Sequence, residues 1–150
     1  MPDTDALGEK SKQAIVNGDF INRVLDADFT SENLAKHYKF TSSIKAVTPN
    51  QHVQDANDTI VQLFYDTDTF EFYRGVENTF LLKAVIAREE LVIDSSIKTG
   101  VGKDIFKEKF ATRIVPDTFL VQDLEAGSVF TFLFDQNKLV RIIYEAPYFD

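Results

Sequence analysis

Cysteine and tryptophan are absent from this chain of 150 residues, and methionine occurs once. Without cysteine, the chain has no disulfide, no thiolate metal ligand and no thiol nucleophile. Histidine is almost as scarce, since His37 and His52 are the only two. A histidine-based metal site or catalytic triad needs partners at defined spacing, and no His-x-x-x-His or similar motif occurs. We therefore interpret both as ordinary surface or half-buried histidines.

Long apolar runs are also missing, because no stretch approaches about 18 consecutive apolar residues. We therefore expect no membrane span. Basic side chains are outnumbered, with 16 Lys and Arg against 24 Asp and Glu, which gives a formal net charge of −8. A protein of this charge repels phosphate backbones, so we expect no nucleic-acid partner. The acidity fits a solvated surface or a partner with a basic surface.

The first twelve residues are polar and acidic, and we expect a flexible N-terminal segment over residues 1–12. They lack the basic and then apolar pattern of a signal peptide. Two locations stay open: the cytoplasm, or the periplasm or cell envelope if an export signal was removed ahead of Met1. We favour the envelope, where this segment would suit an N-terminal tether to a membrane.

Phenylalanine is abundant, with 14 residues that lie mostly after residue 60 in runs typical of strands. Apolar spacing predicts a short or broken helix over 13–27, a helix over 31–39 that Thr30 or Ser31 caps, and a helix over 103–110. Alternation and turn residues predict the strands 59–65, 70–73, 79–87, 91–93, 118–121, 129–134 and 138–144. The polar stretch 41–57 reads as a connection with one short strand near 44–47.

Three strand segments recur at nearly constant distance along the chain. Asp58–Val61 matches Asp117–Leu120 at 59 residues, Phe70–Phe72 matches Phe130–Phe132 at 60, and Leu81–Val85 matches Leu139–Ile143 at 58. Upstream, Leu34 and Tyr38 match Phe106 and Phe110 at 72. A period this long indicates duplicated supersecondary units. We expect one compact α+β unit of two tandem helix-plus-antiparallel-sheet repeats, residues 13–95 and 96–150, with the phenylalanines packed under the helices.

The second repeat resembles a known family. Ile97–Phe106 is similar to the sequence that opens the helix of β-lactamase-inhibitor-protein-like modules, and Asn137–Ile142 is similar to their closing strand. The chain also looks like bacterial envelope lipoproteins of that shape. The resemblance implies a duplicated helix-and-sheet unit that binds protein partners through sheet faces and loops, and it carries over no functional residues.

Motifs with catalytic or ligand-binding chemistry are incomplete throughout the sequence. Asp66, Asp68 and Glu71 could offer oxygen ligands to Ca²⁺, but the glycine and distal glutamate of an EF-hand are missing, so we interpret them as a hairpin turn. Glu89–Glu90 is a poor acid–base pair, because neighbours on a strand point to opposite faces. Gly100–Asp104 lacks the spacing and hydroxyl of a P-loop and reads as the start of a helix. We predict no catalytic, cofactor or metal site.

The aromatic residues are the best candidates for a function, since tyrosines with one wet edge are typical of recognition surfaces. We predict a partner-binding surface formed by Tyr65, Tyr73, Tyr144, Tyr148 and Phe149. The favoured hypothesis is a non-enzymatic protein-binding module with an unknown protein partner. Two alternatives are an inhibitor or immunity-type protein that caps a basic enzyme, and a small-ligand carrier or enzyme with a site between the repeats.

Overall fold

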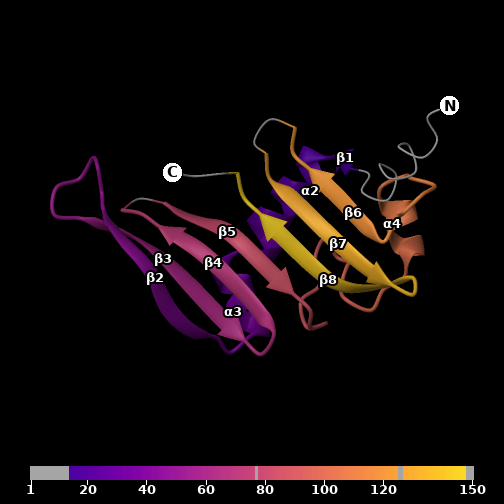
Figure 1. Cartoon of the computed structure of the whole chain (residues 1–150), viewed down its shortest axis with the longest axis horizontal. Coiled ribbons are helices and arrows are strands. Elements are labelled where there is room, and N and C mark those ends of the chain that lie inside the picture. Colours follow the sequence, from indigo (N-terminus) through magenta and orange to yellow (C-terminus); the bar gives the residue numbers. More distant parts are fainter. Residues whose placement is uncertain (1–13, 77, 125–126, 148–150) are drawn as a thin grey trace.

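A single mixed sheet organises the chain in the computed structural model, which describes residues 14–76, 78–124 and 127–147 (Figure 1). Its strands are β1 (Ala14–Val16), β2 (Thr41–Pro49), β3 (Asn57–Tyr65), β4 (Asp68–Arg74), β5 (Thr79–Ile86), β6 (Thr118–Gln122), β7 (Val129–Asp135) and β8 (Lys138–Glu145). The helical segments are α2 (Gly18–Arg23), the π-helical turn η1 (Val24–Asp28), α3 (Ser31–His37) and α4 (Lys103–Lys109). The sheet has the order β1-β6-β7-β8-β5-β4-β3-β2, with β1 parallel to β6 and the other neighbours antiparallel. The expected α+β class is confirmed at this level.

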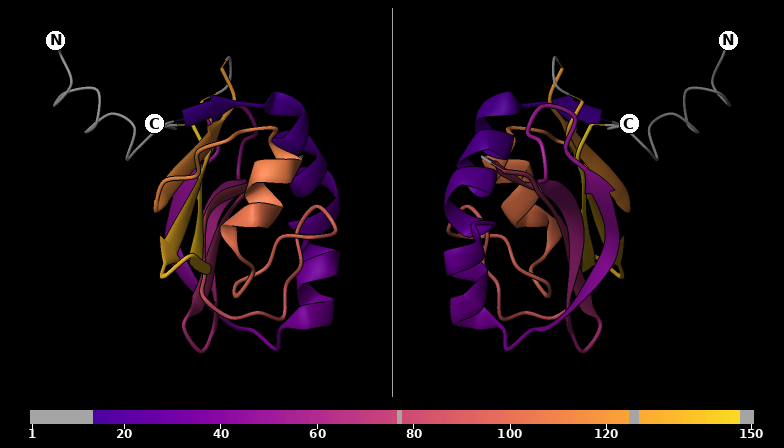
Figure 2. Two further views of the ribbon diagram at one scale, coloured as in Figure 1. Left: turned by 90° about the vertical axis from the view of Figure 1, so that its right-hand side faces the viewer. Right: turned by 90° about the vertical axis from the view of Figure 1, so that its left-hand side faces the viewer.

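All the helical segments lie on the same face of the sheet (Figure 2). The Asn17 side chain caps α2 by accepting a hydrogen bond from the Phe20 backbone N–H at 3.0 Å, and Thr30 caps α3 in the same way through Asn33. The predicted helix over 13–27 is therefore wrong at its start, where β1 pairs with β6, and Gly18 begins α2. None of the helices within the described ranges is long and apolar enough to cross a membrane.

Alternating phenylalanines form the core between the helices and the sheet. Phe130, Phe132 and Phe134 of β7 are buried, whereas the residues between them are half-buried on the other face. The ring of Phe20 packs on that of Phe130 with centroids 5.7 Å apart, and the ring of Phe106 lies 4.8 Å from that of Phe132. In the other half, Phe29 and Tyr38 pack on Phe70. The expectation that these phenylalanines pack under the helices is confirmed.

Two expected elements differ in the structure. The connection 41–57 contains a nine-residue strand, β2, which forms one edge of the sheet and pairs with β3. Its residues are mostly exposed, so it lacks the apolar alternation that marks a strand with a buried face. The segment 91–93 is a loop with buried Leu91 and Ile93 and one bridge from Ile93 to Ile97. Asp94 and Ser95 have φ of 47° and 64°, and this left-handed turn ends the extended run.

Candidate binding surface

The sheet face opposite the helices, hereafter the open face, carries a continuous row of mostly apolar side chains. Direct cross-strand partners place Leu120, Thr131, Ile143, Val85, Thr69 and Phe64 in one line from β6 to β3. Apart from Thr69, which takes the same outward position on β4, each of them is half-buried, and no described segment lies over them. A sheet with one solvated face normally places polar residues there, so four large apolar side chains in this row are unusual.

A charged row runs beside the apolar one. Glu145 of β8 lies opposite Lys83 of β5, and Lys83 lies opposite Glu71 of β4. Lys45 Nζ of β2 extends this row with an ion pair of 2.6 Å to Glu71 Oε1. Positive and negative groups alternate along the row, so the net charge of −8 is not concentrated there. The open face therefore combines an apolar row with balanced charge.

A pocket of about 340 Å³ opens at the β2 end of this face. Its lining is mostly apolar, with Ala46, Ile60, Leu82 and Ala146 among its residues, and Asp58 and Tyr73 supply polar atoms. A second hollow, lined by Asn50 and His52 among others, shares Asp58 and Tyr73 with the first. Ile60 and Tyr73 are cross-strand partners, which explains why β3 and β4 bring these side chains together.

Asp58 is the charged centre of the pocket, and its exposed fraction is only 8%. Its Oδ2 accepts a short hydrogen bond from the Tyr73 hydroxyl, and its Oδ1 accepts one of 3.0 Å from Asn50 Nδ2. The hydrogen bond from Tyr73, followed by that from Asn50, holds the pKa of the Asp58 carboxyl below its usual value. The same contact raises the pKa of Tyr73. Asp58 is therefore a carboxylate with two neutral donors.

The predicted aromatic surface does not form as one patch. Tyr73 lies on the open face beside Phe80, with ring centroids 6.2 Å apart. Tyr65 packs on the opposite face against Tyr38, with centroids 5.7 Å apart, so the two tyrosines of this hairpin are separated by the sheet. The hairpin pairs Tyr65 with Asp68 and Tyr73 with Ile60, and an odd number of residues between Tyr65 and Ile60 on one strand sends them to different faces.

The prediction that Tyr144 lies on a binding surface is wrong. Tyr144 is 2% exposed, and its hydroxyl donates a hydrogen bond of 3.2 Å to Ser128 Oγ inside the protein. Its position on β8 matches that of buried Ile142, two residues earlier, because alternate residues of a strand share a face. Tyr148 and Phe149 lie outside the described residues.

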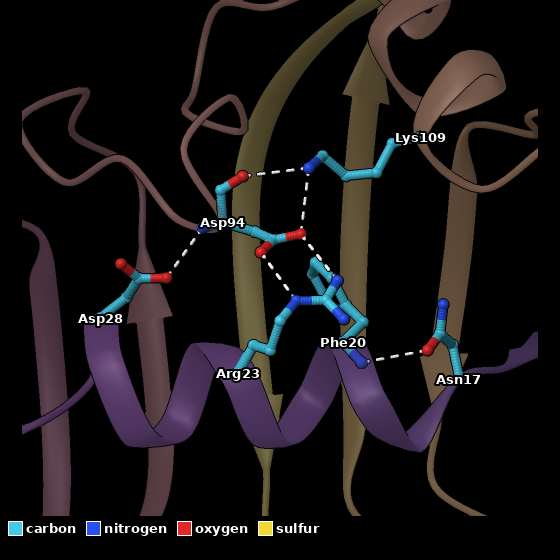
Figure 3. Close-up of polar contacts among 6 residues, drawn as sticks. All are labelled: Asn17, Phe20, Arg23, Asp28, Asp94 and Lys109. Atoms are coloured by element: carbon cyan, nitrogen blue, oxygen red, sulfur yellow. Dashed lines mark hydrogen bonds and ion pairs between the residues drawn. The ribbon is translucent and has the colours of Figure 1, made fainter.

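A second polar constellation joins the helical layer to the loop before α4 (Figure 3). Arg23 donates two hydrogen bonds of 3.1 Å to the Asp94 carboxylate, and Lys109 Nζ lies 3.0 Å from Asp94 Oδ2. Asp28 Oδ2 accepts from the Asp94 backbone N–H at 2.8 Å. Arg23, followed by Lys109, lowers the pKa of Asp94, whereas burial raises the pKa of Asp28. Each charge has a partner, so we interpret this cluster as a structural tie.

The remaining candidate motifs have structural roles as well. Asp68 is fully buried and accepts hydrogen bonds from Tyr38, Ala87 and Arg88, so it is unavailable to Ca²⁺. Asp66 forms an ion pair with Arg88. Within residues 14–76, 78–124 and 127–147, no cluster of three or more His, Asp or Glu side chains is arranged to hold a metal ion. The helix that follows Gly100 begins with Lys103 paired to Asp117.

Sequence reasoning missed the two residues that make the pocket polar. Asp58 was read only as the start of a strand, and Asn50 lies in the polar stretch interpreted as a connection. The alternation of β3 could have placed Asp58 on the same side as Ile60, but no local signal brings Asn50 to it. Comparisons with protein-family models, curated proteins and solved structures find no match for this chain, so its resemblance to a known family stays a prediction.

Proposed function

We propose that this chain is a non-enzymatic protein-binding module that uses the open face of its sheet as the docking surface. The observation that carries the proposal is the segregation of the helical layer to one face, which leaves the row from Leu120 to Phe64 without a covering segment among the described residues. Large apolar side chains at outward positions are typical of interaction surfaces. The row also crosses six neighbouring strands, so its backbone is fixed before a partner arrives.

The composition of the open face suits a protein partner. Apolar centres with charged neighbours are the usual arrangement of protein interfaces, and Lys83, Glu71 and Glu145 provide charge beside the apolar row. The alternation of their signs favours a partner with mixed charge. The alternative of an acidic cap on a basic enzyme cleft draws on the net charge of −8, but this face does not carry that charge in excess.

We also propose that the sheet consists of two copies of one unit, β3-β4-β5 and β6-β7-β8. The pairs Val61–Phe72 and Leu63–Phe70 in the first correspond to Phe119–Phe132 and Val121–Phe130 in the second. These equivalences are 58 residues apart on the first strand and 60 on the second. The offset of 59 from sequence would match outward Ile60 with buried Phe119, and a slip of one residue reverses every face, so it requires correction.

The seam between the two units supports the same proposal. Ala84 lies opposite Phe70 in the first unit, as Tyr144 lies opposite Phe130 in the second. Ala84 also lies opposite Tyr144 where β5 meets β8. A residue that pairs with its own equivalent marks the axis of a two-fold arrangement, because an isologous contact pairs a surface with itself.

A labelling experiment tests the docking surface. The chain has no cysteine, so Thr131→Cys on the open face and Lys107→Cys on α4 each provide a unique site for a bulky maleimide. Both unlabelled variants and the Lys107→Cys conjugate should capture the same partner from extracts of cells that make this protein. The Thr131→Cys conjugate should fail to capture it. Capture that survives the label at residue 131 and is lost with the label at residue 107 would place the docking surface on the helical face instead.

A further inference from the structure

We propose that the pocket around Asp58 and Tyr73 receives an arginine side chain of the partner protein. The proposal deepens the proposed function and rests on it for the source of the arginine. It commits the β2 end of the open face to one kind of contact, in which a guanidinium reaches the Asp58 carboxylate and its aliphatic stem lies along the apolar lining.

The charge of Asp58 is the first reason. Its exposed fraction is 8%, and both of its oxygens accept hydrogen bonds from uncharged donors, the Tyr73 hydroxyl and Asn50 Nδ2. None of the ion pairs formed among the described residues involves Asp58. Such a carboxylate is stabilised as an anion yet lacks a counter-ion, and charges held away from water are normally paired. A cation from outside the chain completes this arrangement.

The shape of the pocket is the second reason. Its volume of about 340 Å³ is at the lower end of the roughly 300–1,000 Å³ typical of ligand sites, which suits one long side chain better than a large cofactor. Ile60, Leu82 and Ala146 offer an apolar wall to the methylene groups of such a side chain. The opening lies on the same face as the apolar row, so a protein docked there can reach it.

The chemistry of the lining selects a guanidinium. The ring of Tyr73 lines the pocket, and guanidinium groups stack on aromatic rings as well as forming forked hydrogen bonds to carboxylates. A metal ion fits poorly, because Ca²⁺ requires six to eight oxygen ligands and Asp58 is the only carboxylate in the lining. Arginine is also among the residues that contribute most strongly at protein interfaces.

Amide NMR titrations with two small probes test the pocket in the intact chain. The first probe is N-acetyl-arginine methylamide, and the second is N-acetyl-citrulline methylamide, which has nearly the same shape without the charge. We expect the arginine probe to shift the amides of Thr48, Ile60 and Leu82, all in the lining. The citrulline probe should bind at least about tenfold more weakly, since a hydrogen bond to a charged group contributes that much.

Two variants of equal net charge sharpen the test. Asp58→Asn keeps the shape of the side chain and should weaken arginine binding about tenfold or more. Asp104→Asn removes a carboxylate whose side chain is 98% exposed on α4, on the opposite face, and should leave binding unchanged. Equal binding of both probes to the wild type overturns the proposal without need of any variant. Shifts confined to residues outside the pocket overturn it as well.

The two proposals fail in different ways. If the arginine probe does not bind but the label at residue 131 still abolishes capture of the partner, the pocket proposal is wrong and the docking surface stands. If the probe binds and the label has no effect, the docking surface is wrong. With a captured partner, Asp58→Asn should lower its affinity, and unchanged affinity would show that a free small cation rather than a partner's arginine uses the pocket.

Discussion

The Tyr38 hydroxyl donates a hydrogen bond of 2.8 Å to Asp68 Oδ2, which joins the end of α3 to the first residue of β4. The other oxygen of Asp68 accepts from the backbone N–H groups of Ala87 and Arg88, just past the end of β5. One buried carboxylate thus holds a helix and two strands together. Burial, followed by the hydrogen bond to Asp68, raises the pKa of Tyr38, so its hydroxyl stays a donor at ordinary pH.

Asp68→Asn should destabilise the protein by about 2 kcal/mol or more, because the new amide turns a donor toward groups that are themselves donors. Tyr38→Phe removes only one of these hydrogen bonds and should cost about 1 kcal/mol. Urea unfolding of the two variants measures the difference. A smaller loss for Asp68→Asn than for Tyr38→Phe would contradict the role given to this carboxylate.

Asp94→Asn should destabilise the protein by about 1 kcal/mol at neutral pH, because it removes the charge that faces Arg23 and Lys109. The folded pKa of Asp94 is lowered, so its stabilisation is complete above the unfolded value of about 3.9 and is lost as pH falls through the folded pKa. The gap between wild type and variant in urea unfolding should therefore close in acid. Asp104→Asn, with only a distant Lys107 partner, should match the wild type at each pH.

Asp28→Asn should show the opposite dependence. Burial raises the folded pKa of Asp28, so the folded state binds its proton more tightly and loses stability as pH rises through that pKa. The asparagine oxygen can still accept the hydrogen bond from the Asp94 N–H, while the buried charge is gone. The stability of Asp28→Asn relative to wild type should thus increase from pH about 4 to neutrality. A decrease over this range would show that the charge itself stabilises the fold.

Tyr73→Phe should raise the pKa of Asp58 toward its ordinary value, because the hydroxyl of Tyr73 is the main reason that this pKa is lowered. Asn50→Ala should raise it less, since Asn50 is the second cause. The titration of the Asp58 side-chain carbon by NMR gives both values. Tyr65→Phe is the matched control, because Tyr65 lies on the other face and should leave the titration of Asp58 unchanged.

Local patterns were sufficient to predict most of the sheet. The buried phenylalanines of β7 alternate with half-buried residues, and the turn at Asp135–Asn137 separates this strand from β8, so both follow from the sequence. Thr30 likewise marks the start of α3. The edge strand β2 could not be recognised in full, because both of its faces are largely exposed and its pairing with β3 alone defines it.

The candidate site was less accessible to sequence reasoning, because it depends on which face each side chain takes. Tyrosine was taken as a mark of the surface, yet the position of Tyr144 on β8 directs it into the core, where Ser128 satisfies its hydroxyl. Tyr73 was selected correctly as an outward residue, but its partner Asn50 lies 23 residues earlier and is brought to the pocket only by the fold. Distance along the chain hides such contacts from local patterns.

Photocrosslinking tests the claim that the open face binds a protein most directly. Benzoylphenylalanine would replace either exposed Arg141 on β8 or Lys107 on α4, in cells that make this protein. We expect a specific covalent adduct from position 141, and none of the same mass from position 107. An adduct from position 107 alone would contradict the account, because the partner would then lie against the helices.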